Sequence, residues 1–327
     1  MKTMSVMEAI REAMSIRMRE DPNVLLFGED VGKFGGCFGV SAGMFDEFGP
    51  ERVRDTPISE GAIIGAATGS AATGLRPIAE IMMDDFITVA MDQLVNNAAF
   101  MHYMFGGKIE LPMVVRTVNG AGVNAAAQHS KSMEAWMTHV PGLKVVYPST
   151  PQDCLGLLLA SIDDNNPVVF FEHKLAYGEK GEVDSLDPIP LGKGDIKREG
   201  TDVTIIAYGY QVFRALEAAK QLEKEGISAE VLDLRTLYPL DKDLIAQSVD
   251  KTHNVVITSE EFKRGGYAGE ISAFIAEELF DSLDAPCRRV CGLNTPVPFS
   301  SVLENQFIPQ VEDIVNAVKA QDGSAER

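Results

Sequence analysis

Glu60 is the residue of this chain whose type and setting best suit chemistry. It lies in an otherwise apolar and small-residue stretch with Ile58, Ile63 and Ile64. A carboxyl group among such residues loses hydration, which favours its protonated form near neutral pH. A protonated acid can act in general acid–base catalysis or share its proton with a heterocyclic nitrogen. The alternative is structural: Ser59 caps a helix, and Glu60 faces the positive end of that helix.

His129 is the second candidate. It lies in a polar loop, residues 128–132, between a small-residue stretch and a helical pattern that contains Trp136. Catalytic groups concentrate in loops held by rigid scaffolds, and histidine changes charge near neutral pH. His129 could protonate or orient a carbonyl group, or it could simply bond its own loop backbone. The remaining histidines show no pairing typical of a metal site.

Two glycine motifs suggest other chemistry and fit it poorly. Gly39–Gly43 matches the G-x-S-x-G pattern of serine hydrolases, but no buried strand precedes it. Gly120–Ala125 follows a strand pattern and resembles a dinucleotide fingerprint. The polar run 128–130 interrupts the helix that should follow, and no strand ending in an acid lies about 20 residues further on. Both functions are therefore disfavoured.

Alternating strand and helix patterns predict the elements that position these residues. The expected strands of the first half are Val24–Phe27, Pro77–Met82, Met113–Thr117, Lys144–Tyr147 and Val168–Glu172. Expected helices lie near 60–74, 84–104, 132–139 and 151–163, and an amphipathic helix over Met1–Glu20 has Ser5 and Glu8 spaced as a capping box. This alternation predicts an α/β protein with a largely parallel sheet covered by helices on both faces.

A connector rich in glycine, proline and charged residues, 174–200, predicts a boundary between two domains. The first domain spans 1–190 and would carry Glu60 and His129. A second series of strands and helices fills 200–327, so both domains are expected to be doubly wound. The helix 61–74 contains glycines four residues apart, which indicates close backbone packing in the core or at a subunit contact.

Composition excludes several classes of function. The chain has 327 residues, 45% hydrophobic and 24% charged, with a formal charge of −19. This charge argues against nucleic acid and suits a basic partner. No apolar run reaches the ~18 residues of a membrane span, and no secretory signal is visible. Four widely spaced cysteines predict reduced thiols in a cytoplasmic protein.

Longer stretches resemble a known family. The resemblance covers essentially the whole chain and rests on Phe27–Val31, Asp55–Glu60, Arg76–Glu80, Met91–Gln93, Ala127–Ser130, His139–Val146, Asp164–Val168 and Pro296–Phe299. In these the chain is similar to the beta subunits of thiamine-diphosphate-dependent 2-oxoacid dehydrogenases, the acetoin type being nearest. The resemblance implies a pyrimidine-binding fold followed by a transketolase C-terminal-like domain.

The same resemblance implies roles for individual residues. Glu60 would hydrogen-bond the pyrimidine nitrogen of thiamine diphosphate and thereby activate the cofactor. Phe86 and Met82 would pack on the pyrimidine face, and Glu29 would be a further cofactor contact. His129 would face the substrate, assisting proton transfer or acyl transfer to a lipoyl group.

Family members also hold a monovalent cation, and potassium is the candidate ion that the resemblance implies for this chain. By position its oxygen ligands would be Asp164 and Asn166, with backbone carbonyls around Ser161 and Ile162. The alternative is a helix end stabilised by turn-forming residues. The sequence does not decide between the two.

The magnesium–diphosphate motif of thiamine enzymes, Gly-Asp-Gly followed by Asn, does not occur in the sequence; Gly194-Asp195 is followed by Ile196. The family pattern then implies that this chain holds only the pyrimidine half of the cofactor, and that an alpha subunit completes an α2β2 heterotetramer. A lipoyl acyltransferase core with a basic binding domain would be a further partner. Acetoin, pyruvate and branched-chain 2-oxoacids remain alternative substrates. A nicotinamide-dependent dehydrogenase and a non-catalytic scaffold are remoter alternatives.

Overall fold

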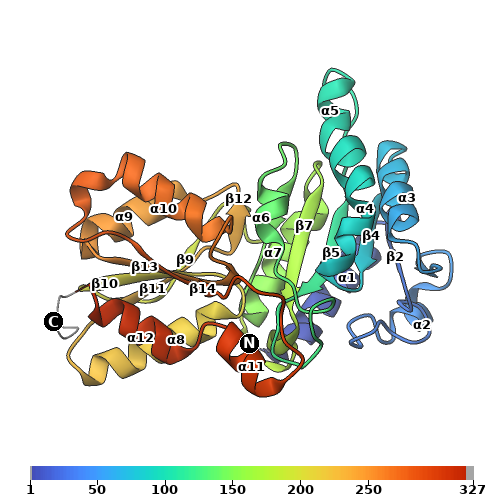
Figure 1. Ribbon diagram of the computed structural model, residues 1–327. Coiled ribbons are helices and arrows are strands. Elements are labelled where there is room, and N and C mark those ends of the chain that lie inside the picture. The colour runs from blue at the N-terminus through green and yellow to red at the C-terminus, as the bar shows by residue number, and fades with distance from the viewer. Residues whose placement is uncertain (1, 322–327) are drawn as a thin grey trace. The chain divides into compact units, whose positions relative to one another are not determined.

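The computed structural model describes residues 2–321, and the chain separates into two compact units. The first comprises residues 1–119 and 136–191, and the second comprises residues 120–135 and 192–327. Each unit has its own sheet and helices (Figure 1). The expected α/β class is confirmed.

The first unit is built on parallel strands hydrogen-bonded in the order β6-β7-β5-β4-β2-β3. Their bounds are β2 (Val24–Gly28), β3 (Val53–Asp55), β4 (Arg76–Ile81), β5 (Val114–Asn119), β6 (Lys144–Val146) and β7 (Val168–His173). The strands β2, β5 and β7 are buried along their whole length, as expected for strands covered on both faces. Short strands β1 (Lys2–Ser5) and β8 (Lys180–Val183) form a separate antiparallel pair.

Helices cover this sheet. Their bounds are α1 (Val6–Glu20), α2 (Met44–Phe48), α3 (Glu60–Ala72), α4 (Ile87–Met91), α5 (Phe100–Met104) and α7 (Pro151–Asp163), with short 3₁₀ turns η1 (Asp84–Phe86) and η3 (Lys174–Gly178). Helix α6 (Glu134–Thr138) crosses the boundary between the two units. Helix α1 packs against α7, and α3 packs against β4.

The N-terminal helix starts later than expected. Residues 2–5 form strand β1 rather than the first helical turn. The capping box is present: the Ser5 hydroxyl accepts from the Glu8 N–H at 3.2 Å, and Glu8 accepts from the Ser5 N–H at 2.7 Å. A capping residue has extended rather than helical backbone, so the cap itself fixes the helix start at Val6.

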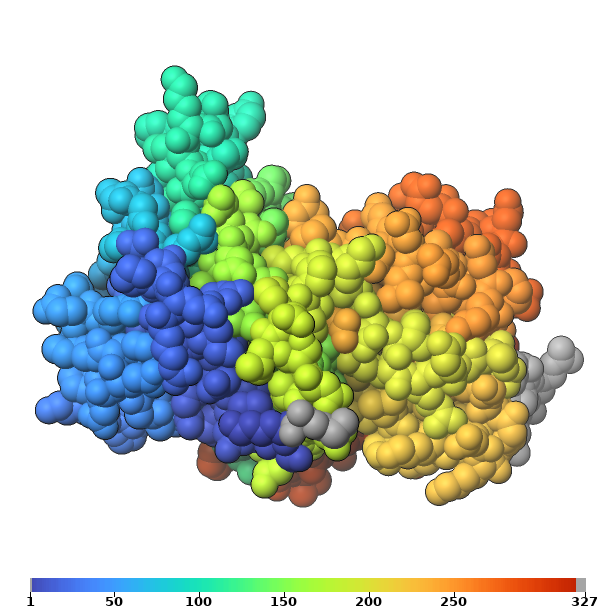
Figure 2. Space-filling view, turned by 180° about the vertical axis from the view of Figure 1, so that it is seen from behind, coloured from blue at the N-terminus to red at the C-terminus, as the bar shows by residue number. Residues whose placement is uncertain are grey.

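The single helix expected over 84–104 is broken into several types of turn. Between α4 and α5 lies a π-helix, η2 (Asp92–Ala99). Such wide turns are uncommon and occur frequently at functional sites. Helix α5 projects from the body of the first unit, where it is seen in both overall views (Figures 1 and 2). Its tip is apolar, and Tyr103 is 87% exposed.

Glycines on α3 pack on these neighbouring turns. A Cβ at Gly65 would lie 3.3 Å from the Gln93 side chain, so close packing within the chain accounts for this glycine. A Cβ at Gly69 would meet no described atom within 4 Å. Gly65 therefore packs against another part of the same chain, whereas the surface at Gly69 is not covered by any described residue.

The second unit contains a five-stranded sheet in the order β14-β13-β10-β11-β9. Its strands are β9 (Asp195–Arg198), β10 (Val203–Ala207), β11 (Ala229–Asp233), β13 (Val255–Phe262) and β14 (Arg288–Gly292), and β12 (Thr236–Tyr238) follows β11. Its helices are α8 (Gln211–Lys224), α9 (Lys242–Thr252), α10 (Tyr267–Glu278), α11 (Ser301–Phe307) and α12 (Val311–Lys319), with the 3₁₀ turn η4 (Phe280–Ser282). All pairs are parallel except the edge strand β9.

Residues 120–135 belong to the second unit, although the sequence places them in the first domain. Ala121 is buried in a cluster with Val297, Phe307 and Ile308. The carboxylates of Glu260 and Glu304, both in the second unit, also accept hydrogen bonds from the backbone of this segment. These contacts bind the segment to residues far along the chain, which no local pattern reveals.

None of the helices described within residues 2–321 is both long and apolar enough to cross a membrane. The four cysteines are free thiols, as expected.

Candidate functional site

The carboxyl ends of β2, β3 and β4 form the site. The chain runs from β2 to β3 on one side and then crosses to β4 on the other side. Ligands of open α/β sheets bind at such a switch point. Gly28, the last residue of β2, pairs with Asp55 and Glu80 on the two neighbours, so the residues that follow these strands lie at one edge. A Cβ on Gly28 would lie only 2.7 Å from the Glu80 carbonyl oxygen, which explains the glycine.

Glu60 is the first residue of α3 and is 8% exposed. The structural alternative required Ser59 to cap this helix, but among the described residues its side chain forms no capping hydrogen bond. Within residues 2–321 no group forms a hydrogen bond with the Glu60 carboxylate. Ile63 and Ile64 are buried as expected, whereas Ile58 is 83% exposed and does not shield the acid.

Glu29 follows β2 directly and is half-buried. Burial raises the pKa of its carboxyl, and the negative charges of Glu60, Asp30 and Glu80 raise it further. Glu29 and Glu60 therefore interact electrostatically, although the sequence alone gave no geometric reason to pair them. A cluster of acids of this kind favours proton retention and attracts positive charge.

Met82 and Phe86 lie just after the neighbouring strand, β4. Met82 follows the end of β4, and Phe86 ends the 3₁₀ turn η1, so both are placed at the same edge of the sheet as Glu29. Both side chains are half-buried. They supply an apolar thioether and an aromatic ring, which suit packing against a flat heterocycle.

A buried charge network supports this edge and was not foreseen from the sequence. Arg116 on β5 is 1% exposed and donates to both Glu172 oxygens at 2.7 and 2.8 Å and to Glu80 at 2.7 Å. The Tyr177 hydroxyl donates to Glu172 at 2.6 Å. Burial raises the pKa of Glu80, and Arg116 opposes that effect. Charged residues within strand patterns were the available signal, because such residues are rarely buried unless paired.

His129 lies in the second unit, half-buried, in a loop with unusual backbone conformation. Ala126 has φ of 59°, the left-handed region that alanine rarely adopts, and Asn124 has φ of 57°. Such strain clusters at functional sites and persists only where other contacts impose it. Here Glu304 imposes it, accepting from the N–H groups of Gly122 at 2.8 Å and Asn124 at 3.0 Å.

These same contacts bear on the rival functions. A dinucleotide would need the amides of Gly120–Ala125, but carboxylates of Glu260 and Glu304 already accept from three of them. A pyrophosphate would meet these negative charges. In the hydrolase-like motif, the Ser41 hydroxyl is buried and donates to the Val31 carbonyl at 2.8 Å, so it is not presented as a nucleophile.

The predicted cation ligands lie around the end of α7. Two of them, Asp164 and the Ile162 carbonyl, already interact with the positively charged side chains of Lys144 and Arg76. Lys144 forms an ion pair with the Asp164 carboxylate, and Asn166 donates to the same group at 2.8 and 2.9 Å. Arg76 donates to the Ile162 carbonyl at 3.0 Å, while the Ser161 hydroxyl donates to its own helix. As arranged, these oxygens do not fit a bound cation. The potassium site stays a prediction without support from the geometry.

The chain matches two families along its length. Residues 2–180 match the family described as "Transketolase, pyrimidine binding domain", and residues 192–314 match "Transketolase, C-terminal domain". It is 52% identical to the acetoin:2,6-dichlorophenolindophenol oxidoreductase subunit beta of Bacillus subtilis, over 96% of both chains. The chain belongs to the family of beta subunits of thiamine-diphosphate-dependent acetoin and 2-oxoacid dehydrogenases.

Other members of this beta-subunit family are nearly as similar. The pyruvate dehydrogenase E1 component subunit beta-2 of Oryza sativa is 47% identical, over 97% of this chain and 86% of the relative. The 2-oxoisovalerate dehydrogenase subunit beta of Bacillus subtilis is 46% identical over 98% of both. Among solved structures, a split gene transketolase described as an inactive beta4 tetramer superposes with a TM-score of 0.81 at 25% identity, over 99% of both chains.

Proposed function

We propose that this chain is the beta subunit of the first component of an acetoin dehydrogenase complex. It would help to cleave the carbon–carbon bond of acetoin and transfer the acetyl unit to lipoamide. Two acetoin-type relatives, at 52% and 48% identity, support this choice. Pyruvate and 2-oxoisovalerate enzymes at 47% and 46% support the alternative, oxidative decarboxylation of a 2-oxoacid.

One observation carries the proposal: Glu60, a residue only 8% exposed, lies at the sheet's switch point, and its carboxylate has no hydrogen-bond partner among residues 2–321. A carboxylate in this position is free to accept or share a hydrogen bond with a ligand. The pyrimidine ring of thiamine diphosphate offers a nitrogen for such a bond. When bound, this cofactor supplies the electron sink for cleavage next to a carbonyl group.

The residues of the chain then have separate tasks. Glu60 holds a proton at the pyrimidine nitrogen, and Phe86 and Met82 cover the ring and exclude water. Glu29, whose pKa is raised by burial and by Glu60, adds negative charge at the same edge. His129 moves a proton on the substrate side.

The alpha subunit belongs to the same proposal. The chain does not contain the diphosphate-binding motif of thiamine enzymes, so a partner chain would bind the magnesium–diphosphate half in an α2β2 assembly. The exposed apolar tip of α5 and the open part of α3 are contact elements for such a partner. Docking of the lipoyl acyltransferase core and a cytoplasmic location stay predictions.

Replacement of Glu60 by glutamine tests the proposal. Glutamine keeps the shape but cannot supply the proton, so we expect turnover of the reconstituted two-subunit enzyme to fall by roughly 100-fold or more. Proton exchange at the thiazolium carbon of the cofactor should slow in parallel. Glu110→Gln is the matched control, because Glu110 is an exposed acid of the same unit. Near-normal turnover of Glu60→Gln with intact assembly would support a scaffold role instead.

Substrate preference is tested on the same preparation. The reconstituted enzyme should show a higher kcat/KM for acetoin than for pyruvate or 2-oxoisovalerate. A preference for either oxoacid would leave the cofactor role of Glu60 intact and change only the substrate.

A further inference from the structure

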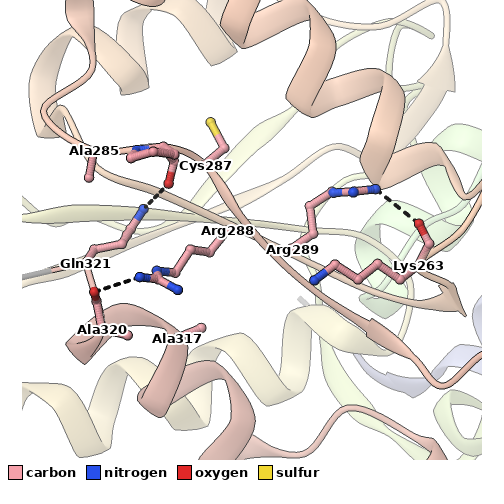
Figure 3. Close-up of a pocket in the computed structure, with 9 residues that line it drawn as sticks. Lys263, Ala285, Cys287, Arg288, Arg289, Ala317, Ala320 and Gln321 are labelled. Carbon is pink, nitrogen blue, oxygen red and sulfur yellow. Dashed lines mark hydrogen bonds between the residues drawn. The ribbon is translucent and has the colours of Figure 1, made fainter. Parts of the chain in front are cut away.

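The second unit contains a cavity of about 590 Å³ on the side of the sheet where β14 and α12 meet. Figure 3 shows Lys263 and Arg289 at one end of it, and Arg288 and Gln321 at the other. The other lining residues have short side chains: Ala285, Pro286 and Cys287 in the loop before β14, and Ala317 and Ala320 in and just after α12. Its volume is in the range of small-molecule sites.

Positive charge is concentrated at this cavity. Lys263, Arg288 and Arg289 all line it, and no acidic residue of the described part of the chain does. Among residues 2–321, no carboxylate forms an ion pair with any of the three. This arrangement is unusual in a chain whose 48 acids outnumber its 29 lysines and arginines. Within residues 2–321, these three cations around one cavity leave a local positive potential that an anion would offset.

Backbone contacts hold these side chains in place. Arg288 donates through Nη2 to the Ala320 carbonyl at 2.9 Å, and Arg289 donates through Nη1 to the Lys263 carbonyl at 3.0 Å. Gln321 donates to the Val255 carbonyl at 2.8 Å. Each arginine therefore uses one part of its guanidinium group as an anchor and keeps further N–H donors. A preorganised guanidinium fork matches carboxylate and phosphate oxygens.

Neighbouring cavities differ in character. A cavity of about 330 Å³ shares Lys263 and Arg289 but also contains the acid Asp313. Another, of about 370 Å³, is mainly apolar, is lined by Phe280 and Leu283, and contains Asp284 but no lysine or arginine. A further cavity, of about 350 Å³, is lined by Lys131 and Arg264 and by no described acid, so the first cavity differs from it in having three basic residues rather than two.

We propose that this basic cavity binds a small organic anion with at least two negative charges on carboxylate or phosphate groups. The charge of −19 disfavours a long polyanion such as nucleic acid or an acidic protein segment, because most of such a ligand would lie over acidic surface. A small ligand experiences mainly the three nearby cations. The site does not depend on the proposed catalytic role of Glu60.

Isothermal titration calorimetry on the full chain tests the proposal, with pyrophosphate and citrate as separate probes for phosphate and carboxylate chemistry. We expect at least one of them to bind, and more weakly as salt is raised. Lys263→Gln and Arg288→Gln should each weaken binding by at least about fivefold. Both residues are exposed, so the fold should tolerate the changes.

Lys224→Gln is the charge-matched control, since Lys224 is exposed at the end of α8 and does not line the cavity. Its affinity should equal that of the unaltered chain. Absence of binding by both probes at millimolar concentration would overturn the proposal. Equal weakening in all three variants would also overturn it, and so would tighter binding of a polyglutamate peptide than of either small anion.

Discussion

Glu29, Glu60 and Glu80 bring three carboxyl groups to the carboxyl ends of β2 and β4. Arg116 offsets the charge of Glu80, and burial together with the neighbouring acids raises the pKa of Glu29. The remaining negative charge favours a ligand that carries a proton or a positive charge. The proposed cofactor has both an accepting ring nitrogen and a cationic thiazolium ring, which agrees with this electrostatic setting.

At His129, replacement by alanine separates chemistry from binding. One positioned proton donor typically contributes ~100-fold or more in rate, so we expect His129→Ala to slow acyl transfer to lipoamide or substrate turnover by that factor. Cofactor affinity should stay within about tenfold of the unaltered enzyme, because Phe86, Met82 and Glu60 are retained. Stopped-flow kinetics and a thiamine diphosphate titration measure the two effects. A large loss of affinity with normal chemistry would contradict the assignment.

Secondary-structure elements were predictable where the signal is local. Strands β2, β4 and β7 end within one residue of their expected bounds, because continuous apolar runs mark strands buried on both faces. Helix α7 occupies the expected residues, since Thr150 and Pro151 mark its start. Glu60 was singled out from its own neighbours, and its catalytic role stays a prediction.

Elements whose structure depends on distant residues were not predictable. The π-helix η2 lies within a pattern that reads as ordinary helix, and α11 is short with Val302 and Leu303 exposed, so it has no clear apolar face. The contacts that join segment 120–135 to the second compact unit were not predictable, because its acceptors, Glu260 and Glu304, lie far along the chain. Arg116 and its partners come from three separate strands and the turn that follows one of them.

Glu304 anchors the loop that carries His129, and glutamine at this position should loosen it. A carboxylate accepts both N–H bonds, whereas an amide presents an NH2 group to one of them. Losing a hydrogen bond to a charged acceptor costs about 1.5–3 kcal/mol, so the Gly122 and Asn124 amides should exchange hydrogen at least about tenfold faster. Hydrogen exchange measured by mass spectrometry or NMR checks this. Glu312→Gln, at an exposed acid of α12, should leave the exchange unchanged.

One buried acid, Glu261, should make the stability of the whole molecule depend on pH. Glu261, at the end of β13, is buried and accepts from the Tyr208 hydroxyl at 2.8 Å and from the Ala268 N–H at 3.2 Å. Burial raises the pKa of Glu261 to about 7, although these donors oppose the shift. The folded chain therefore retains a proton that the unfolded chain loses at lower pH.

The sign of the effect follows from this difference. Between the unfolded pKa near 4.5 and the folded value of about 7, the folded state binds more protons, so its stability falls as pH rises through this window. The shift corresponds to about 3 kcal/mol at most. Urea unfolding at several pH values should show this loss, and Glu261→Gln should flatten it. An unchanged slope in the variant would rule out Glu261 as the cause.

The anchoring of the 120–135 segment has a consequence for biosynthesis. The Glu304 carboxylate that binds the Gly122 amide lies 182 residues later in the chain. At a translation rate of roughly 5–20 residues per second, that acceptor leaves the ribosome about 10–40 s after its donor. A nascent chain can complete the first sheet well before the His129 loop receives its support. The loop that carries His129 is thus among the last parts of a newly made subunit to gain its supporting contacts, and a chain terminated before Glu304 would lack them.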